Sequence, residues 1–410
     1  MTTSAAGPRR PAAPGRALRA PWTSWTSWWA QAAIAVLGLA MLAAQTATPT
    51  PLYARYAERW ALEPLAISAV FAAYVIGLAV ALLCLGGLSD HVGRRPVGLA
   101  ALTAALAAMA VLALAGGFAA LVAGRVLQGL AAGLGMAAFG AALIDHAPPA
   151  RRPAFAMANS ALLPIATGLG AVVSALVLVG SRSVAASYVV QGAGIAVALA
   201  ATLALRECHP RRPGALRSLR PGLVLPAAIR HTFVRAGAGV AASWSLVGLY
   251  LGLGPLVTTT VFGIDTPLAG ALAVASASGT GGVASVLTVR LAARRAMTLG
   301  CGLLLVASAL VVVAVTSRDV TLYFTASTIG GFGFGCAFQA GLRTVVAAAP
   351  GEHRAGVLAA LYLVSYVAFG VPSLAASVFA PLVGLESAVV IYAGLIAALT
   401  AGSLVLGARR

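Results

Sequence analysis

The sequence predicts an all-α membrane protein with twelve transmembrane helices in two six-helix pseudo-repeats, both termini being cytoplasmic. Three observations support this fold class. Hydrophobic residues make up 60% of the 410 positions, charged residues make up only 9%, and the apolar positions fall into twelve long runs. A soluble domain averages about 25% charged residues, so this chain cannot cover a water-facing surface. A spanning helix needs about 20 apolar residues, and twelve of them account for most of the chain.

The apolar runs define the expected helices in order. Six runs precede a polar stretch rich in arginine and proline, and six follow it. The expected spans are about 29–48, 65–88, 97–115, 118–143, 154–180, 185–205, 236–262, 267–289, 296–316, 320–346, 355–380 and 385–408. Gly116 and Gly117 mark the third boundary, because glycine readily leaves the helical conformation.

Four parts of the chain follow from these runs. They are a cytoplasmic N-terminal segment 1–28, a first six-helix bundle 29–205, a basic cytoplasmic loop 206–235 and a second bundle 236–410. The N-terminal segment resembles a signal peptide, but the run after it has spanning length, so we expect a retained first helix. Tryptophan prefers the headgroup level of a membrane, and four tryptophans precede this helix, at Trp22, Trp25, Trp28 and Trp29.

The distribution of arginine predicts the orientation. With the N-terminus in the cytoplasm, twenty-two arginines fall on the cytoplasmic side and four, namely Arg55, Arg59, Arg182 and Arg318, on the other. Cytoplasmic loops of membrane proteins carry the excess of basic residues. The asymmetry therefore predicts that both termini are cytoplasmic and that the number of spans is even.

The net charge of +18 does not indicate a nucleic-acid protein. Such a protein concentrates its basic residues on one soluble face, whereas here they occupy short gaps between apolar runs. The four cysteines, Cys84, Cys208, Cys301 and Cys336, lack the close spacing of metal ligands. We therefore predict no nucleic-acid partner, no metal and no cofactor.

A glycine-rich charged segment lies between the second and third expected spans. It reads Gly-Gly-Leu-Ser-Asp-His-Val-Gly-Arg-Arg-Pro over 86–96. Gly86 and Gly93 permit a tight turn and close helix approach, and Asp90 can pair with Arg94 or Arg95. The segment resembles the signature loop of the major facilitator superfamily, in which it implies a latch that holds the two halves together in one conformation. The second half has Arg294 and Arg295 at an offset of 200, but no carboxylate matches Asp90.

A second motif places a charge inside the fourth span. Arg125 is followed by Gln128 and Gly129, which is similar to the superfamily's helix-4 signature. An intramembrane charge usually faces a cavity or a partner. The resemblance implies a role in proton coupling or in holding an anionic partner. The alternative is a structural arginine that snorkels to the outer interface.

The superfamily resemblance implies a solute site near the midplane between the halves. The candidate substrate-binding residues are Gln45, Trp244, Tyr250, Phe334, Phe338 and Gln339, with Gln128 also nearby; each is alternatively a packing residue. Aromatic and amide side chains without charge suit a neutral or cationic amphipathic solute, or a sugar. No Asp or Glu lies in the middle of a predicted span. Helix 5 has Pro164 and two glycines but lacks the Gly-Pro pair of drug-exporting branches.

The resemblance implies a multi-pass transporter of the cytoplasmic membrane, and not an enzyme. We expect a monomer that moves a small-molecule solute by alternating access, with a drug-like compound exported against a proton. A sugar or metabolite permease is the alternative. A membrane enzyme or receptor is a third class, but the five histidines all fall in expected loops, and no nucleophile with a base lies at membrane depth.

Overall fold

The computed structural model describes residues 25–208, 213–215, 219 and 225–408, and every regular element in these residues is helical. Eleven helical segments among them are long and apolar enough to cross a membrane. The prediction of an all-helical, multi-pass membrane protein is therefore confirmed. The expected span 320–346 forms a helix, but it is not one of the eleven, because its many glycine and hydroxyl residues reduce its hydropathy. The count of twelve spans stays a prediction.

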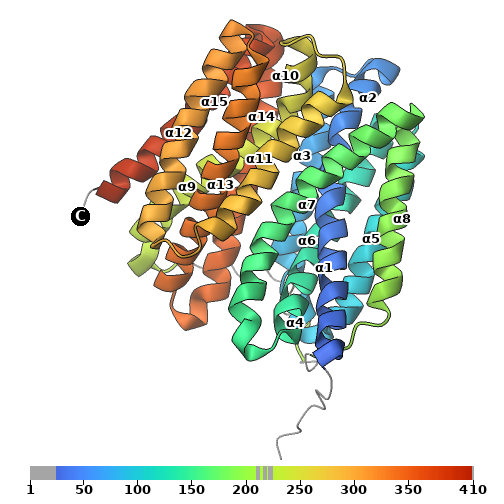
Figure 1. Cartoon of the computed structure of the whole chain (residues 1–410), viewed down its shortest axis with the longest axis vertical. Coiled ribbons are helices and arrows are strands. Elements are labelled where there is room, and N and C mark those ends of the chain that lie inside the picture. Colours follow the sequence, from blue (N-terminus) through green and yellow to red (C-terminus); the bar gives the residue numbers. More distant parts are fainter. Residues whose placement is uncertain (1–24, 209–212, 216–218, 220–224, 409–410) are drawn as a thin grey trace, which may run out of the picture.

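The first half of the chain, blue to green in Figure 1, forms one group of packed helices. Its helices are α1 (Trp25–Ala47), α2 (Tyr53–Trp60), α3 (Pro64–Val80), α4 (Leu88–Val92), α5 (Arg94–Ala113), α6 (Phe118–His146), α7 (Arg152–Ser181) and α8 (Val184–Thr202). Helix α6 lies inside this group and packs against α1, α3 and α5. Side chains on α6 are therefore well placed to contact several neighbouring helices.

The second half, yellow to red in Figure 1, forms a group of the same kind. Its helices are α9 (Arg230–Gly248), α10 (Gly254–Thr260), α11 (Pro267–Leu287), α12 (Ala293–Ser317), α13 (Val320–Ala348), α14 (Arg354–Val383) and α15 (Leu385–Ala408). Helix α13 packs against α9, α11 and α12, and α9 also packs against α14 and α15. Short 3₁₀ turns precede α2, α7, α9 and α14, at Thr50–Leu52, Pro149–Arg151, Ala227–Ile229 and Gly351–His353.

One stretch of each half repeats the other in element lengths. A 29-residue helix, a three-residue 3₁₀ turn and a 30-residue helix occur as α6 to α7 and again as α13 to α14. Pro148 and Pro350 stand before the two turns. Proline restricts the residue before it and cannot continue a helix, so both long helices end at the same relative position.

The expected span 236–262 is interrupted by a π-helical turn. Helix α9 passes into a π turn at Leu249–Leu253, and α10 follows. Pro255 lies just after this turn and has no backbone N–H to donate. The missing donor explains why the hydrogen-bond pattern shifts there. A second π turn, Ala81–Leu85, joins α3 to the loop before α4.

The two halves meet through α3 with α14 and through α7 with α11. Ser68 on α3 and Ser377 on α14 share a hydrogen bond. The rings of Phe71 and Phe369, on the same two helices, lie 5.1 Å apart in an edge-on arrangement. Polar and aromatic contacts therefore join the halves along one helix pair.

Parts of the predicted domains lie outside the described residues. These are 1–24 of the N-terminal segment with Trp22, then 209–212, 216–218 and 220–224 of the central loop, and 409–410. Within the described part, Trp28 stacks on Trp29 at 4.0 Å, and the guanidinium of Arg151 lies 5.6 Å from the Trp28 ring. The division of the chain into 1–28, 29–205, 206–235 and 236–410 stays a prediction.

Candidate functional site

Arg125 is buried inside the first half, where its side chain is 1% exposed. Its Nη1 donates to the backbone oxygen of Thr46 at 3.2 Å and to Oε1 of Gln128. Its Nε donates to the backbone oxygen of Val70 at 3.4 Å, and its guanidinium lies 4.4 Å from the centre of the Tyr74 ring. The arginine therefore joins α6 to α1 and α3, which contradicts the alternative of snorkelling to the interface.

No carboxylate of the described residues forms an ion pair with Arg125. A buried charge without a counter-ion is costly unless hydrogen bonds or an aromatic face stabilise it. Carbonyl dipoles, an amide oxygen and the Tyr74 ring supply this stabilisation. The side chain is therefore held as a cation by neutral groups.

Gln128 and Gly129 complete the motif in different ways. Gln128 lies on the same face of α6 as Arg125, and its Nε2 donates to the backbone oxygen of Gln45 at 2.6 Å. A Cβ on Gly129 would lie 2.7 Å from the backbone nitrogen of Leu78. Glycine is therefore required where α6 and α3 touch, whereas Gln128 extends the hydrogen-bond network to α1.

The predicted latch segment forms a network around Arg94. The Nη1 of Arg94 donates to Oδ1 of Asp90 at 2.5 Å and to Oγ of Ser89 at 2.6 Å. The Nε of Arg94 donates to Oδ2 of Asp145 at 3.2 Å. Arg94 is buried, whereas Asp90 is largely exposed. Asp145 lies at the end of α6. The arginine thus ties the start of α5 to α4 and to α6, all within the first half.

The other latch residues position this network. Gly86 joins the π turn to α4 with helical dihedral angles. Gly93 has a φ of 111°, a region that favours glycine, and a Cβ there would lie 2.5 Å from Oε2 of Glu207. Oε2 of Glu207 accepts the backbone N–H of Arg95 at 2.9 Å, and the Arg95 side chain donates to the oxygen of Leu203 at 2.7 Å. The segment after α8 is therefore bound to the start of α5.

His146 makes a further connection to the segment after α8. Its Nδ1 lies 2.8 Å from the oxygen of Ala142, and its Nε2 lies 3.1 Å from Sγ of Cys208. Partial burial raises the pKa of the Cys208 thiol, and the nearby carboxylates of Glu207 and Asp145 raise it further. A raised pKa makes a thiol less reactive as a nucleophile.

Three predicted solute residues gather on the second half. Trp244 on α9 lies at the centre of four aromatic rings whose centroids are 5.3–5.6 Å away, each in an edge-on arrangement. These rings belong to Phe334, Phe338, Tyr366 and Phe369. The indole Nε1 of Trp244 is buried without a hydrogen-bond partner in the described structure. The group, hereafter the Trp244 cluster, therefore combines aromatic faces with a buried N–H donor that is free in the described structure.

Sequence reasoning missed the contribution of α14 to this cluster. None of the candidate residues named from the sequence belongs to the eleventh expected span, whereas Tyr366 and Phe369 come from it. Tyr362, Tyr366 and Phe369 recur at helical spacing and so share one face of α14. This periodicity was the available signal.

The remaining candidates make no ring contact with Trp244. Tyr250 is fully buried and packs on Tyr323 at 5.3 Å, and the hydroxyl groups of both have no partner in the described structure. Gln339 is half-buried on α13 beside Phe338. Gln45 is fully buried, and both polar atoms of its amide lack partners there. Its position next to Thr46 places it beside the Arg125 network.

Helix α3 connects the Arg125 network to the Trp244 cluster. Val70 and Tyr74 contact Arg125, while Phe71 between them contacts Phe369 of the cluster. A shift of α3 against α14 would therefore change the surroundings of Arg125 and of the Trp244 cluster together.

In the described residues, no group of three or more His, Cys, Asp or Glu side chains is placed to hold a metal ion.

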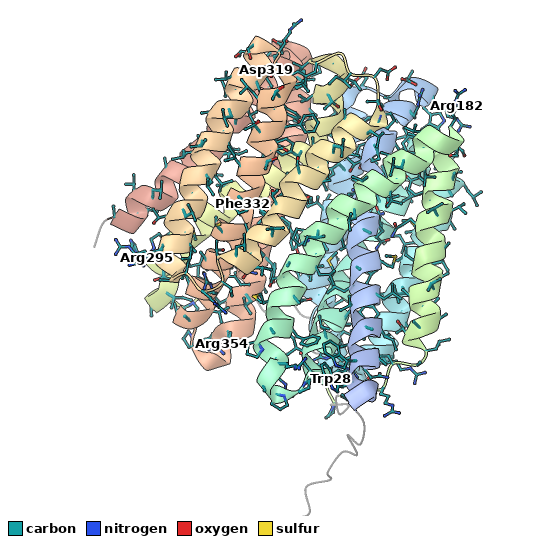
Figure 2. The ribbon with its side chains drawn as sticks, in the orientation of Figure 1. Trp28, Arg182, Arg295, Asp319, Phe332 and Arg354 are labelled. Carbon is teal, nitrogen blue, oxygen red and sulfur yellow. The ribbon has the colours of Figure 1, made fainter. Side chains whose placement is uncertain are left out.

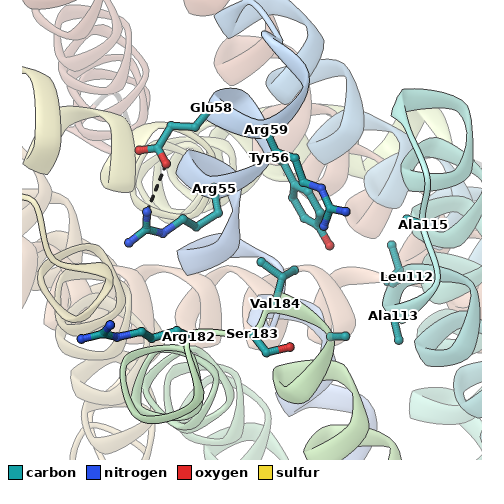
Figure 3. A pocket seen from close by; sticks show the side chains of 11 residues that line it. Arg55, Tyr56, Glu58, Arg59, Leu112, Ala113, Ala115, Arg182, Ser183 and Val184 are labelled. Carbon is teal, nitrogen blue, oxygen red and sulfur yellow. Dashed lines mark hydrogen bonds and ion pairs between the residues drawn. The ribbon is translucent and has the colours of Figure 1, made fainter.

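A further cavity, not expected from the sequence, lies where α2, α5 and α8 meet (Figure 3). Its volume is about 500 Å³, and Arg55, Arg59 and Arg182 line it. Glu58 also lines the cavity and pairs with Arg55 at 3.1 Å. Three cations against one anion give this end of the first half a positive surface.

The family of the chain follows from a comparison of sequences. A family model described as Major Facilitator Superfamily matches residues 33–371. The chain belongs to this superfamily. The resemblance inferred from the two motifs is thus confirmed. Its members are membrane transporters and not enzymes, so this chain is classed with membrane transporters.

Solved structures with the same fold match this protein over nearly its whole length. The human organic anion transporter MFSD10 (TETRAN) matches with a TM-score of 0.67 and 18% identity, over 92% of this chain and 99% of its own. A bacterial homolog of the human lysosomal transporter Spinster, inward-facing and unoccupied, matches with a TM-score of 0.73 and 15% identity, over 94% and 98%.

A third structure, a transporter of the POT family in complex with 5-aminolevulinic acid, has a TM-score of 0.73 and 12% identity, over 93% of this chain and 96% of its own. At these identities the likeness establishes the shared fold. No curated protein matches the sequence.

Proposed function

We propose that this superfamily member exports a small, drug-like compound across the cell membrane by alternating access, as a proton antiporter. The observation that carries the proposal is the Trp244 cluster. Its aromatic faces can hold an apolar or cationic solute, and its single unpaired indole N–H can orient it. The cluster also contacts α3 of the other half through Phe71, as a site between two moving halves requires.

The proposed topology has twelve spans with both termini in the cytoplasm, in a monomer. It is supported by the arginine asymmetry and by the packing of α13 among α9, α11 and α12. Helix α13 is less apolar than its neighbours but is covered by them. A covered helix needs less apolar surface than a lipid-facing one.

The loop 86–96 is proposed to act as a conformational latch through Gly86, Asp90, Gly93, Arg94 and Arg95. Asp90 is 54% exposed in its side chain, so one carboxylate oxygen remains open to a second partner. When the halves close on this side, that oxygen can accept a bond from the second half. The Arg94 network holds Asp90 ready for this contact.

Proton coupling is proposed to involve the Arg125 network. A buried cation held by neutral groups responds to any charge that arrives nearby, because the local dielectric constant is low. The described acidic residues all lie in loops or at helix ends, so a proton would have to be carried by the solute or by one of these peripheral carboxylates.

The alternative, a sugar or metabolite permease, is favoured by one observation. The unpartnered amide of Gln45 and the unpartnered hydroxyls of Tyr250 and Tyr323 are hydrogen-bonding groups of the kind that bind sugar hydroxyls. A polar, uncharged solute would satisfy them without proton coupling.

The deciding experiment expresses the protein in an efflux-deficient bacterial host and measures growth on a panel of toxic compounds. Export predicts selective protection that is lost in equally abundant Trp244→Ala and Arg125→Ala variants. Protection by the wild type that both variants retain would contradict the proposed site. No protection by membrane-inserted wild type would favour the permease.

Coupling is tested separately in proteoliposomes. Antiport predicts that solute flux follows an imposed pH gradient and stops when a protonophore removes the gradient. Flux that is indifferent to the gradient would sink the coupling and leave the transporter assignment intact.

A further inference from the structure

We propose that the second half binds an anionic phospholipid in a basic groove at the α12 end that begins with Ala293. This lipid site is distinct from the Trp244 cluster, and it depends only on the membrane embedding of the chain. The groove is defined here by two adjoining cavities that share Arg294 and Thr298.

The larger cavity has a volume of about 720 Å³ and is lined by α12 alone, with Arg294, Arg295, Leu299 and Gly302 among its residues. The smaller has a volume of about 270 Å³ and lies between α9, α12, α13 and α15, with Arg235 on its far wall. Three arginines from two helices therefore line two adjoining hollows, the larger of which is widely open. Figure 2 places Arg295 on the outer flank of the second half, away from α3 and α7.

The charge of the groove is not balanced by the protein. Neither cavity has an acidic lining residue, and the guanidinium groups of Arg235, Arg294 and Arg295 form no ion pair or hydrogen bond within the described residues. At the opposite end of α12 the situation differs, because Arg318 pairs with Glu386 at 2.9 Å. Only the Ala293 end of this helix pair thus lacks a carboxylate partner in the described structure.

An apolar stripe leads away from the arginines along α12. Leu299, Val306 and Val313 are 45–49% exposed and follow one another at seven-residue spacing, so they share one face of the helix. Gly302 lines the larger hollow beside this stripe and faces open space, since nothing lies within 4 Å of a Cβ placed there. A ligand with a charged head and an apolar tail would contact the arginines with its head and the apolar stripe with its tail. A free phosphate would contact only the arginines.

The chemistry selects an anionic lipid over a zwitterionic one. Guanidinium groups bind phosphate oxygens in bidentate geometry, and basic residues near a membrane surface attract anionic lipids by an amount that grows with each Arg. A zwitterionic headgroup would bring its own cation into a groove that already holds three. The occupant is therefore expected to be a phosphatidylglycerol-like lipid of the adjacent leaflet.

The test measures lipid retained by the detergent-purified protein in native mass spectrometry, with phosphatidylglycerol or phosphatidylcholine added. The wild type should retain phosphatidylglycerol in preference. A triple variant, Arg235→Gln, Arg294→Gln and Arg295→Gln, should lose about ten-fold or more in apparent affinity. The matched control replaces three exposed arginines outside the groove, Arg230→Gln, Arg290→Gln and Arg354→Gln, and should keep the wild-type affinity.

A second variant leaves the charge unchanged. Gly302→Leu puts a bulky side chain into the larger hollow and should weaken lipid retention, whereas Gly394→Leu, at a glycine in open space outside the groove, should not. Equal retention by the triple variant, or equal loss in the matched control, would overturn the proposal. So would displacement of the lipid by glycerol phosphate at concentrations that match the lipid, because the groove would then be a site for a soluble anion.

Discussion

Two regions of the protein, the arginine networks of the first half and the aromatic groups of the second, satisfy their buried polar groups in different ways. In the first half, Arg125 and Arg94 bind several acceptors each, and Gln128 bridges to α1. In the second half, the polar atoms of Trp244, Tyr250 and Tyr323 are buried without partners in the described structure. The Arg125 and Arg94 networks therefore use their polar groups in internal bonds, while these three side chains of the second half leave theirs available.

This difference suggests a division of roles. A saturated network holds helices in place and resists substitution, because removing one partner leaves the others unsatisfied. An unpaired donor among aromatic rings costs free energy until a ligand or water binds it. Gln45 lies beside the Arg125 network but has a free amide, as Tyr53 has a free hydroxyl. Through the Gln45 amide the first half would contribute to a solute site.

The largest effect is expected from Arg125→Leu. The change leaves the Gln128 amide oxygen without its arginine donor and removes the bonds to the Thr46 and Val70 carbonyls, and a buried unsatisfied acceptor costs about 1–3 kcal/mol. We expect a lower thermal unfolding midpoint in detergent and loss of transport. The control is Arg290→Leu, an exposed position in the loop before α12. An unchanged midpoint in the Arg125 variant would show that the network is dispensable.

The next effect is expected from Asp90→Asn. Arg94 keeps its bond to Asp145, so the fold should survive, and the stability loss should stay below about 1 kcal/mol because Asp90 is exposed. Turnover should fall by more than the amount of protein in the membrane falls. The comparison variant is Asp265→Asn in an exposed loop. Equal turnover at equal abundance would refute a role for Asp90 in the conformational cycle.

A smaller effect is expected from Trp244→Phe, which keeps an aromatic ring but removes the N–H. A neutral hydrogen bond contributes about 0.5–1.5 kcal/mol, so KM for the solute should rise by about 2- to 10-fold with kcat unchanged. Trp29→Phe, in an exposed position, serves as the control. If both variants match the wild type, the solute does not use the indole donor.

The smallest effect is expected from Ser68→Ala, which removes the hydrogen bond to Ser377 between the halves. Such bonds average about 0.6 kcal/mol in membrane proteins, so the opening equilibrium should shift by about 3-fold. Maleimide labelling of Ala57→Cys, in a background without the four native cysteines, reports this opening, because Ala57 lines a small cavity beside Ser68. Equal labelling rates would indicate that apolar packing alone holds this contact.

The sequence predicted the helical architecture because hydropathy is local. Runs of apolar residues delimit helices whatever their neighbours are, and Gly116 with Gly117 separated α5 from α6 as expected. The resemblance of two contiguous motifs to those of the superfamily likewise indicated Arg125 and Arg94. The motifs did not predict which groups bind each arginine, because partners such as Val70, Tyr74 and Asp145 come from other helices.

By itself, the sequence determined that this protein is a multi-pass helical membrane protein of a recognisable superfamily, because composition and contiguous motifs suffice for that. Only the tertiary structure decided that Arg125 is bound by neutral groups, that α14 completes the Trp244 cluster and that three arginines of α9 and α12 surround one groove. The physical reason is that these features depend on which helices pack together. Helix packing is set by side-chain shape across distant segments, which periodicity along one segment does not record.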